Sequence, residues 1–288
     1  AYQVYSNKGL PMNYDASWAG INPLEVVEAT VNDDPWHLQA GYQTARKNFR
    51  REPRFYADLC FDGGRWGMYG STLANVDCNS ELLFSYQCRM NGPQSQLPSN
   101  TGGTLTGYFA KKLFPYQMSI NTSASPASLT TYWYPWPMIR LADLYLLYAE
   151  AVNEYEGPSG AHSQMMFNRI DAVRERAGIP GVKESWDTYS TAPGRYNSQT
   201  GMREIIHRER LIELAFESQR FWDLRRWKEA PAVYSQGIWG YYVKASSPEE
   251  YYRIVQIAEQ PFTTKNYFWP IMTSNIERNT NLVQNIGW

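Results

Sequence analysis

The sequence predicts a mainly helical protein with irregular loops and a few short strands. Residues 138–230 carry apolar side chains at the helical period, in segments that turns with Gly and Pro separate. Residues 1–137 are instead rich in Gly, Pro, Asn, Ser and aromatic residues, with short elements between long loops. We therefore expect a loop-rich part over 1–137, a helical-repeat-like part over 138–230, and a loop-rich tail over 231–288 that packs on the helices.

Composition excludes several classes of protein. The chain has 288 residues and a hydrophobic share of 43%, which is ample for a core and excludes wholesale disorder. Its 27 Lys and Arg residues balance 28 Asp and Glu residues, so no basic excess is present to neutralise the phosphates of a nucleic acid. Its 22 Tyr, 11 Trp and 11 Phe residues exceed what a core needs, so we expect aromatic rings on the surface as well as inside.

Neither the cysteines nor the first residues carry a cross-linking or targeting pattern. Cys60, Cys78 and Cys88 are sparse and odd in number, and no CxxC metal spacing is present. We favour free buried thiols, and a Cys78–Cys88 bridge is the alternative. The N-terminus shows no secretory signal pattern, and no run reaches the roughly 18 apolar residues that a membrane-spanning helix needs.

The first part contains three short predicted elements. Asn22–Ala29 is typical of a short helix, with Asn22 as the N-cap and Pro23 at the first helical position. Arg54–Phe61 and Gly107–Leu113 have the composition of short strands. The long loops between these elements are candidates for function.

Three longer segments have the period of helices. In Met138–Glu154 the charged residues fall within an arc of about 80° and the rest is mostly apolar, which predicts a helix buried on nearly all sides. Ser163–Ala177 ends at Gly178, a typical C-cap residue. Met202–Ser218 presents one apolar face and continues into a short aromatic helix over Phe221–Trp227. Paired antiparallel helices with short turns favour a helical-repeat arrangement.

A charged stripe marks the Met202–Ser218 helix when it is extended to residue 220. Glu209, Glu213 and Glu217 repeat every four residues, and like charges at this spacing destabilise an isolated helix. Guanidinium groups offset such repulsion, because each binds a carboxylate with two hydrogen bonds. The arginines nearby in the sequence are Arg210, Arg220, Arg225 and Arg226. We interpret the stripe as a structural Arg–Glu network; a carboxylate pair for glycoside hydrolysis is the alternative.

The stretch Glu209–Trp227, ERLIELAFESQRFWDLRRW, closely resembles the signature of the SusD/RagB family. These proteins are surface glycan-binding lipoproteins of certain Gram-negative bacteria. Further stretches resemble the family in the same order: Glu52–Ala57, Met138–Ala151, Asn168–Gly178 and Trp269–Trp288. Met272 and Ile286 replace prolines that are usual in the family's C-terminal segment. The resemblance implies a protein about twice as long as this chain. We therefore expect this chain to be a C-terminal half.

The resemblance implies what the protein does and where. It implies a non-catalytic protein that binds oligosaccharides or polysaccharides without a cofactor. It implies a SusC-like TonB-dependent outer-membrane transporter as the partner that receives the sugar. It implies a surface-exposed, lipid-anchored protein of the outer membrane, with the anchor outside this chain. The missing N-terminal half of the same protein is then the partner that covers the apolar helix faces.

Aromatic loops are the candidate sites for a sugar, which presents C–H faces to a ring and hydroxyl groups to polar neighbours. The resemblance implies a stacking ring in the loop after the Arg-Phe segment, which makes Trp66 the first candidate. Trp36 and Tyr69 come next. The full set of candidate ligand-binding residues is Trp66, Trp36, Tyr69, Trp18, Arg65 and Asp62. A ring that merely fills a crevice is the alternative for each aromatic residue.

Other aromatic residues have a structural interpretation. Trp133–Pro137 leads directly into a predicted buried helix, so we interpret it as a packing wedge. Trp222 and Trp227 lie in the signature helix, and we expect them in the core.

No motif for catalysis or for a metal is present. The three histidines have no neighbouring nucleophile motif, and neither HExxH nor GxSxG occurs. Asp33 and Asp34 supply too few oxygens for calcium by themselves. Two functions remain as alternatives to glycan binding. One is a family member that binds peptides through edge-strand contacts, and the other is a glycoside hydrolase that uses Glu209, Glu213 or Asp223.

Overall fold

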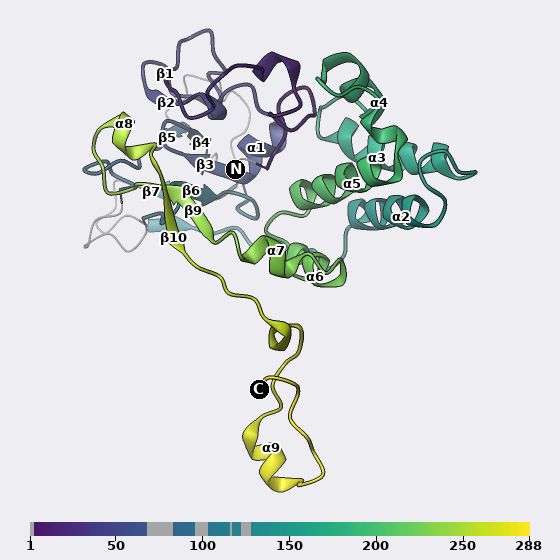
Figure 1. Cartoon of the computed structure of the whole chain (residues 1–288). Helices are drawn as coiled ribbons and strands as arrows, with labels where there is room; N and C mark the ends of the chain where they lie inside the picture. Colours follow the sequence, from purple (N-terminus) through teal and green to yellow (C-terminus); the bar gives the residue numbers. More distant parts are fainter. Residues whose placement is uncertain (1–2, 68–82, 96–102, 116, 122–127) are drawn as a thin grey trace.

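The computed structural model describes residues 3–67, 83–95, 103–115, 117–121 and 128–288. Figure 1 shows the short strands on one side, the helices on the other, and a C-terminal segment that projects away from both. The predicted class, mainly helical with irregular loops and a few short strands, is confirmed. Within these residues no helix is long and apolar enough to cross a membrane.

The first part consists of short strands and turns. Its elements are η1 (Ala16–Trp18), β1 (Val26–Glu28), β2 (Gln43–Ala45), η2 (Arg46–Asn48), α1 (Pro53–Asp58), β3 (Leu59–Phe61), β4 (Arg65–Gly67), β5 (Leu83–Ser85), β6 (Tyr108–Ala110), β7 (Ser119–Asn121) and β8 (Ser128–Thr130). The strands form antiparallel pairs: β1 with β2, β3 with β6, β4 with β5, and β7 with β8.

The helix predicted over Asn22–Ala29 is wrong. The Asn22 side chain accepts a hydrogen bond from the backbone N–H of Leu24 at 3.1 Å, which closes a turn instead of capping a helix. The following Val26 and Val27 are β-branched and lie in β1, where Val26 is opposite Ala45 of β2. A distant strand therefore determines the structure of this segment.

The two predicted strands are only partly present. Arg54–Phe61 begins as helix α1, because Pro53 at the first helical position has its φ already fixed and follows the extended Glu52. Only its last three residues form β3, which pairs with β6. The strand predicted over Gly107–Leu113 is confirmed over β6, Tyr108–Ala110.

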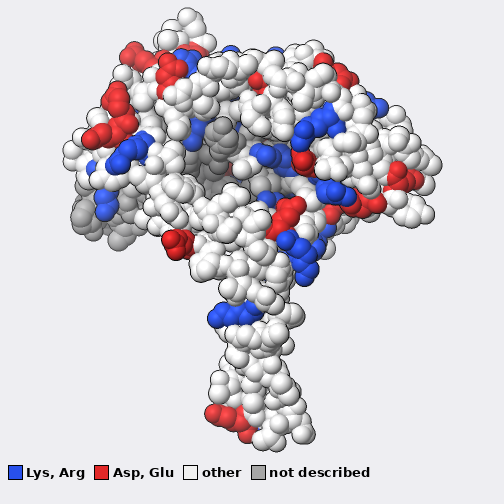
Figure 2. Space-filling model, in the orientation of Figure 1, with Lys and Arg blue, Asp and Glu red and all other residues white. Residues whose placement is uncertain are grey.

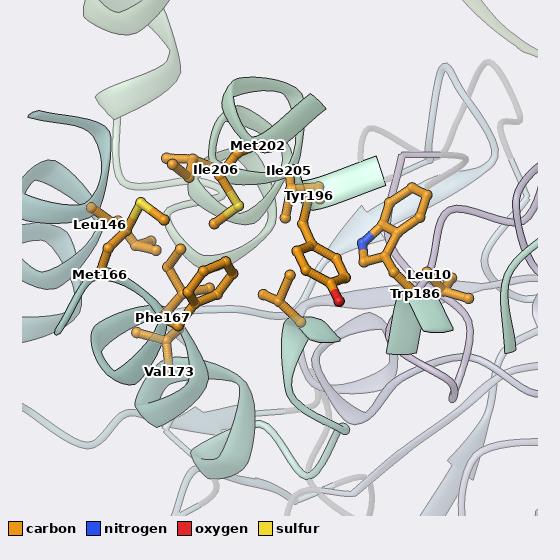
Figure 3. Packing of buried hydrophobic residues seen from close by; sticks show 13 residues of the cluster. Leu10, Leu146, Met166, Phe167, Val173, Trp186, Tyr196, Met202, Ile205 and Ile206 are labelled. Carbon is orange, nitrogen blue, oxygen red and sulfur yellow. The ribbon is translucent and has the colours of Figure 1, made fainter. Parts of the chain in front are cut away.

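The helical part follows the predicted order. Its elements are α2 (Leu141–Glu156), α3 (Ser163–Arg176), α4 (Val182–Glu184), the π-helix η3 (Ser185–Tyr189), η4 (Arg195–Asn197), α5 (Gln199–Glu213), α6 (Gln219–Arg226) and α7 (Ala230–Tyr234). Figure 3 shows the core that α2, α3 and α5 share, with Leu146, Met166 and Ile206 turned toward one another. Gly178 has φ +74° after α3, as its predicted C-cap role requires. Helix α5 ends at Glu213 rather than Ser218, because Phe216 and Ser218 are left-handed.

Helix α2 is not buried on nearly all sides, and that prediction is wrong. It packs against α3 and α5 through one face, which carries Leu146 and Ala149. Its other face is open: Leu141 is 60% exposed, and Leu144 and Leu147 are exposed as well. The helix therefore presents an apolar face without a cover among the described residues.

The C-terminal part contacts the strand-rich part and also α6, where the ring of Trp269 lies 6.4 Å from that of Phe221. Its elements are β9 (Ile238–Tyr241), α8 (Pro248–Tyr251), β10 (Ile254–Ala258), η5 (Thr264–Tyr267) and α9 (Thr273–Arg278), and β9 pairs with β10. Tyr241, Tyr251 and Tyr252 are buried in a cluster with Ala45 and Cys88 of the first part, not on the helices. Residues beyond β10 project from the body in Figure 1. The aromatic side chains of the hairpin thus complete the core of the strand-rich part.

The tryptophans of the signature helix and the cysteines can be compared with their predicted positions. Trp222 is exposed, so its predicted core position is wrong, whereas Trp227 is half-buried. Cys60 and Cys88 are free and buried, as we favoured. Cys78 lies outside the described residues.

Candidate functional site

Trp66, the first candidate, lies on β4 opposite Phe84 of β5. Its ring stacks on Tyr86 with the centroids 5.6 Å apart, and Phe114 approaches edge-on at 5.4 Å. The Lys111 ammonium lies 5.8 Å from the ring centroid. The indole is therefore fixed by neighbours yet half-buried rather than enclosed. Sequence reasoning missed these supporting residues, because they come from segments far apart in the chain.

Trp36 is 42% exposed. It lies on a loop whose conformation is held by hydrogen bonds within the loop. Asp34 accepts hydrogen bonds from the backbone N–H of Trp36 at 3.2 Å and from the His37 ring at 2.7 Å. The His37 ring also stacks on Tyr56 at 4.3 Å. Burial alone would raise the pKa of Asp34, but its hydrogen bond and charge interaction with His37 outweigh this and lower it.

Arg65 joins the two tryptophan segments. Leu38 and Gly64 form an antiparallel bridge, and the Arg65 N–H donates to the carbonyl of His37 at 3.0 Å. The Arg65 guanidinium donates to the carbonyl of Pro35. The hydrogen bonds of Arg65 thus join the loop that carries Trp36 to the start of β4, and we call Trp36, Arg65 and Trp66 the aromatic surface.

Asp62 is not a surface ligand residue, and that prediction is wrong. Its side chain is 1% exposed and accepts four hydrogen bonds. The hydroxyl groups of Tyr42 and Tyr252 donate at 2.8 and 2.7 Å, the Cys88 N–H at 2.8 Å and the Arg89 guanidinium at 2.9 Å. A buried carboxylate with this many donors is a structural hub. Asp62 therefore ties the β3–β4 turn, just before Arg65 and Trp66, to the rest of the strand-rich part.

The other two candidate rings do not join the aromatic surface. Trp18 is 5% exposed at the end of η1, with the Arg50 guanidinium 5.4 Å from its ring, so it is a packing residue. Tyr69 lies outside the described residues. The short helix η1 forms because Asp15 caps it, accepting from the Ser17 N–H at 2.8 Å, and this turns Trp18 inward.

The packing wedge predicted at Trp133–Pro137 is wrong. Trp133 is 85% exposed, and Trp136 is exposed too. Only Tyr134 is fixed, by a hydrogen bond from its hydroxyl to the Leu113 carbonyl at 2.8 Å. Among the described residues, the two tryptophans and Leu141 at the start of α2 are thus all exposed.

The carboxylates of the charged stripe are held in ion pairs, which confirms the structural interpretation. Glu209 is fully buried between Arg54 at 2.7 Å and Arg174 at 3.0 Å. Glu213 lies 3.1 Å from Arg54 and 3.0 Å from Arg140. The partners thus come from α1, α3 and the segment before α2, whereas we predicted arginines close in sequence.

Asp223 and Glu209 are also poorly suited to acid–base chemistry. Asp223 receives two hydrogen bonds from Arg210, at 3.0 and 3.1 Å. Burial alone would raise the pKa of Glu209, but Arg54 and Arg174 outweigh it and hold that pKa below its usual range. A general acid needs the opposite shift.

Fold and site together define a class: a mainly helical protein with a few short strand pairs, whose loop-rich part carries the partly exposed Trp36 and Trp66. The chain belongs to the SusD family, whose sequence model, SusD_RagB, matches residues 1–288. The resemblance seen in the sequence is therefore confirmed.

Individual relatives agree with this assignment. The chain is 41% identical over 90 residues to the SusD-like protein P25 of Formosa agariphila, an alignment that covers 31% of this chain and 15% of that protein. It superimposes in full on 43% of BT4246 with a TM-score of 0.77 and 24% identity, a likeness of fold. It also superimposes over 81% of its length on 42% of a SusD-like carbohydrate binding protein (BF0978) of Bacteroides fragilis, with a TM-score of 0.54 and 26% identity. The chain thus spans less than half the length of these solved relatives.

Proposed function

We propose that the protein is a non-catalytic glycan-binding protein that captures oligosaccharides at the aromatic surface. The observation that carries this proposal is the setting of Trp66: a half-buried indole, stacked on Tyr86, next in sequence to Arg65, whose side chain binds the loop that carries the exposed Trp36. A sugar can stack its C–H face on a ring that is already held in place, so binding orders few side chains.

Polar groups beside the rings supply partners for sugar hydroxyls. The guanidinium of Arg65, which also binds the Pro35 carbonyl, and the ammonium of Lys111, which also binds the Tyr56 carbonyl, are the cations nearest in sequence or space to Trp66. Family membership supports a carbohydrate as the ligand, and the Bacteroides fragilis relative is described as a carbohydrate binding protein. We place ligand binding in the part over residues 1–137.

The absence of hydrolysis is part of the proposal. Glu209, Glu213 and Asp223 are the carboxylates that a hydrolase would use, and each lies in buried ion pairs with arginines. A general acid must be protonated, and protonating one of these carboxylates would leave buried arginines without a charge partner, which costs free energy.

The partners follow from the family. We propose that the protein is lipid-anchored at the outer-membrane surface and delivers its sugar to a SusC-like TonB-dependent transporter. We also propose that an N-terminal half of the same protein covers the open face of α2, where Leu141, Leu144 and Leu147 are exposed. Stacked helical repeats bury such faces against their neighbours.

Replacing the central ring tests the ligand site. We expect Trp66→Ala to weaken binding of the best ligand of a glycan panel about 10- to 30-fold in isothermal titration, because a central aromatic contact contributes about 2 kcal/mol. Trp269→Ala is the control, since it removes an exposed tryptophan whose ring neighbour is Phe221 of α6, outside the aromatic surface, and it should leave glycan affinity unchanged.

Two outcomes would contradict the proposal. If Trp66→Ala bound its glycan with unchanged affinity, the aromatic surface would not be the binding site. Binding of peptides with no binding of any glycan would favour the peptide-binding alternative instead.

A further inference from the structure

A cavity of about 770 Å³ lies apart from the aromatic surface. Its size is that of a small-ligand site. Its walls come from β6, β9, residues 22–24 and the turn between α5 and α6. Figure 2 shows a hollow in the middle of the body, with basic and acidic side chains on its helical side. Neither the family match nor the proposed function assigns a role to this cavity.

Strand β9 carries aromatic side chains from the interior of the cavity to its rim. Trp239 and Tyr241 are two residues apart on β9, so their side chains share one face of the strand. Tyr241 is buried, whereas Trp239 is 53% exposed. The indole N–H of Trp239 donates to the carbonyl of Gln236 at 2.6 Å. Because its one donor is used, Trp239 offers a ligand its ring face.

The inner end of the cavity is built rigidly. The hydroxyl groups of Tyr108 and Tyr241 are 3.0 Å apart, and their rings stack with the centroids 5.6 Å apart. A Cβ on Gly107 would lie 2.4 Å from the Tyr241 ring, and one on Gly240 would lie 2.7 Å from the Cα of Thr106. Glycine permits both close approaches. The inner walls are therefore already in place before a ligand arrives.

Phe216 closes the cavity on the side of the helices. Its backbone has φ +63°, a left-handed conformation that is strained for a bulky residue. Its side chain is exposed although it lines the cavity. Backbone strain of this kind is concentrated at ligand-binding positions.

Lys47 determines the charge of the cavity. It is the only charged residue among the described residues that line it. Its ammonium lies 4.7 Å from the ring centroid of Tyr241 and 5.8 Å from that of Tyr108. An anion at the inner end would therefore meet a cation, with no carboxylate in the lining to repel it.

We propose that this cavity is a second carbohydrate site, which takes an oligosaccharide that carries a carboxylate, a uronate. Trp239 stacks on a sugar ring at the rim, and Lys47 binds the carboxylate at the inner end. This proposal rests on one part of the proposed function, namely that the protein binds carbohydrates.

Isothermal titration with trimers of galacturonate, glucuronate and mannuronate tests the second site. We expect at least one trimer to bind, and its carboxyl-reduced counterpart to bind about 10- to 100-fold more weakly, as loss of a charge-assisted hydrogen bond predicts. Lys47→Met should weaken binding to the same degree. Trp239→Ala changes only the exposed rim, so it remains informative if the buried Lys47 variant does not fold. Trp269→Ala again serves as the unchanged control.

The outcomes separate this inference from the proposed function. The second site is overturned if no uronate trimer binds, if reduced trimers bind equally well, or if binding is lost in Trp66→Ala but not in Trp239→Ala. The last result leaves the aromatic surface as the glycan site. Failure of the protein to bind any glycan, neutral or acidic, overturns both proposals.

The pH dependence gives a second readout. Burial, with a contribution from Arg51, lowers the pKa of Lys47 to about 8. Burial raises the pKa of the facing Tyr108 to about 12 and that of Tyr241 well above its usual value, so neither ionises nearby. Uronate affinity should therefore fall as the pH rises from 7 to 9, because Lys47 loses its proton while the carboxylate keeps its charge. A flat profile would exclude Lys47 as the counter-charge.

Discussion

Glu209→Gln should lower the free energy of unfolding by about 3–5 kcal/mol, because it takes the carboxylate partner from the buried Arg174 and one of three carboxylate partners from Arg54. Both guanidinium groups are already removed from water in the folded protein, and Glu209 is the carboxylate that lies between them. Urea denaturation followed by circular dichroism measures the change.

The matched control is Glu204→Gln on the same helix. Glu204 pairs with Arg195 at the surface, where such pairs contribute about 0–1 kcal/mol. Equal small losses for the two variants would show that the buried network does not support the fold.

Acid unfolding provides a check on the same network. In the folded protein the pKa of Glu209 lies below its ordinary value of 4.5. Its stabilisation is therefore present above that value and is lost as the pH falls through the lowered folded pKa. The unmodified protein should lose more stability on acidification than Glu209→Gln, and parallel losses would contradict this contribution.

Asp62→Asn should destabilise the protein by about 3 kcal/mol, because it replaces a buried acceptor of four hydrogen bonds by a group that itself carries donors. It should also weaken glycan binding at the aromatic surface, since Asp62 lies in the turn that precedes Arg65 and Trp66. Urea denaturation measures the loss of stability. Isothermal titration, carried out where the variant is still folded, measures the loss of glycan binding.

The control for this prediction is Asp33→Asn. Asp33 accepts from the N–H and the hydroxyl of Thr30 at 2.8 Å, but it is only half-buried and both bonds are exposed. Its change should cost about 1 kcal/mol or less. If Asp62→Asn kept full stability but lost binding, Asp62 would be a ligand contact rather than the structural hub described above.

The helices could be predicted because their information is local. The period of apolar residues places α2, α3 and α5, and Gly178 marks the end of α3. The end of α5 could not be predicted, because the stretch after Glu213 continues the helical pattern while Phe216 adopts a left-handed backbone. Tertiary packing overrides local propensity there.

The strands and the site were harder to predict because their information is distant in sequence. Val26 and Val27 form a strand only because β2 lies beside them. Trp18 and Trp66 look alike as aromatic residues in loops, yet Trp18 is buried and Trp66 is half-buried. Asp62 differs from a surface aspartate only through partners up to 190 residues away. The family resemblance points to one loop, and the contacts show which of its side chains are exposed and which are buried.

A crystal structure of the protein with a bound neutral oligosaccharide tests the central claim most directly. The account predicts a sugar ring with its C–H face within about 4 Å of the Trp66 indole, the contact distance of apolar groups, and with hydroxyl groups near Arg65. A ligand bound elsewhere, with no contact to Trp36, Arg65 or Trp66, would contradict the aromatic surface as the glycan-binding site.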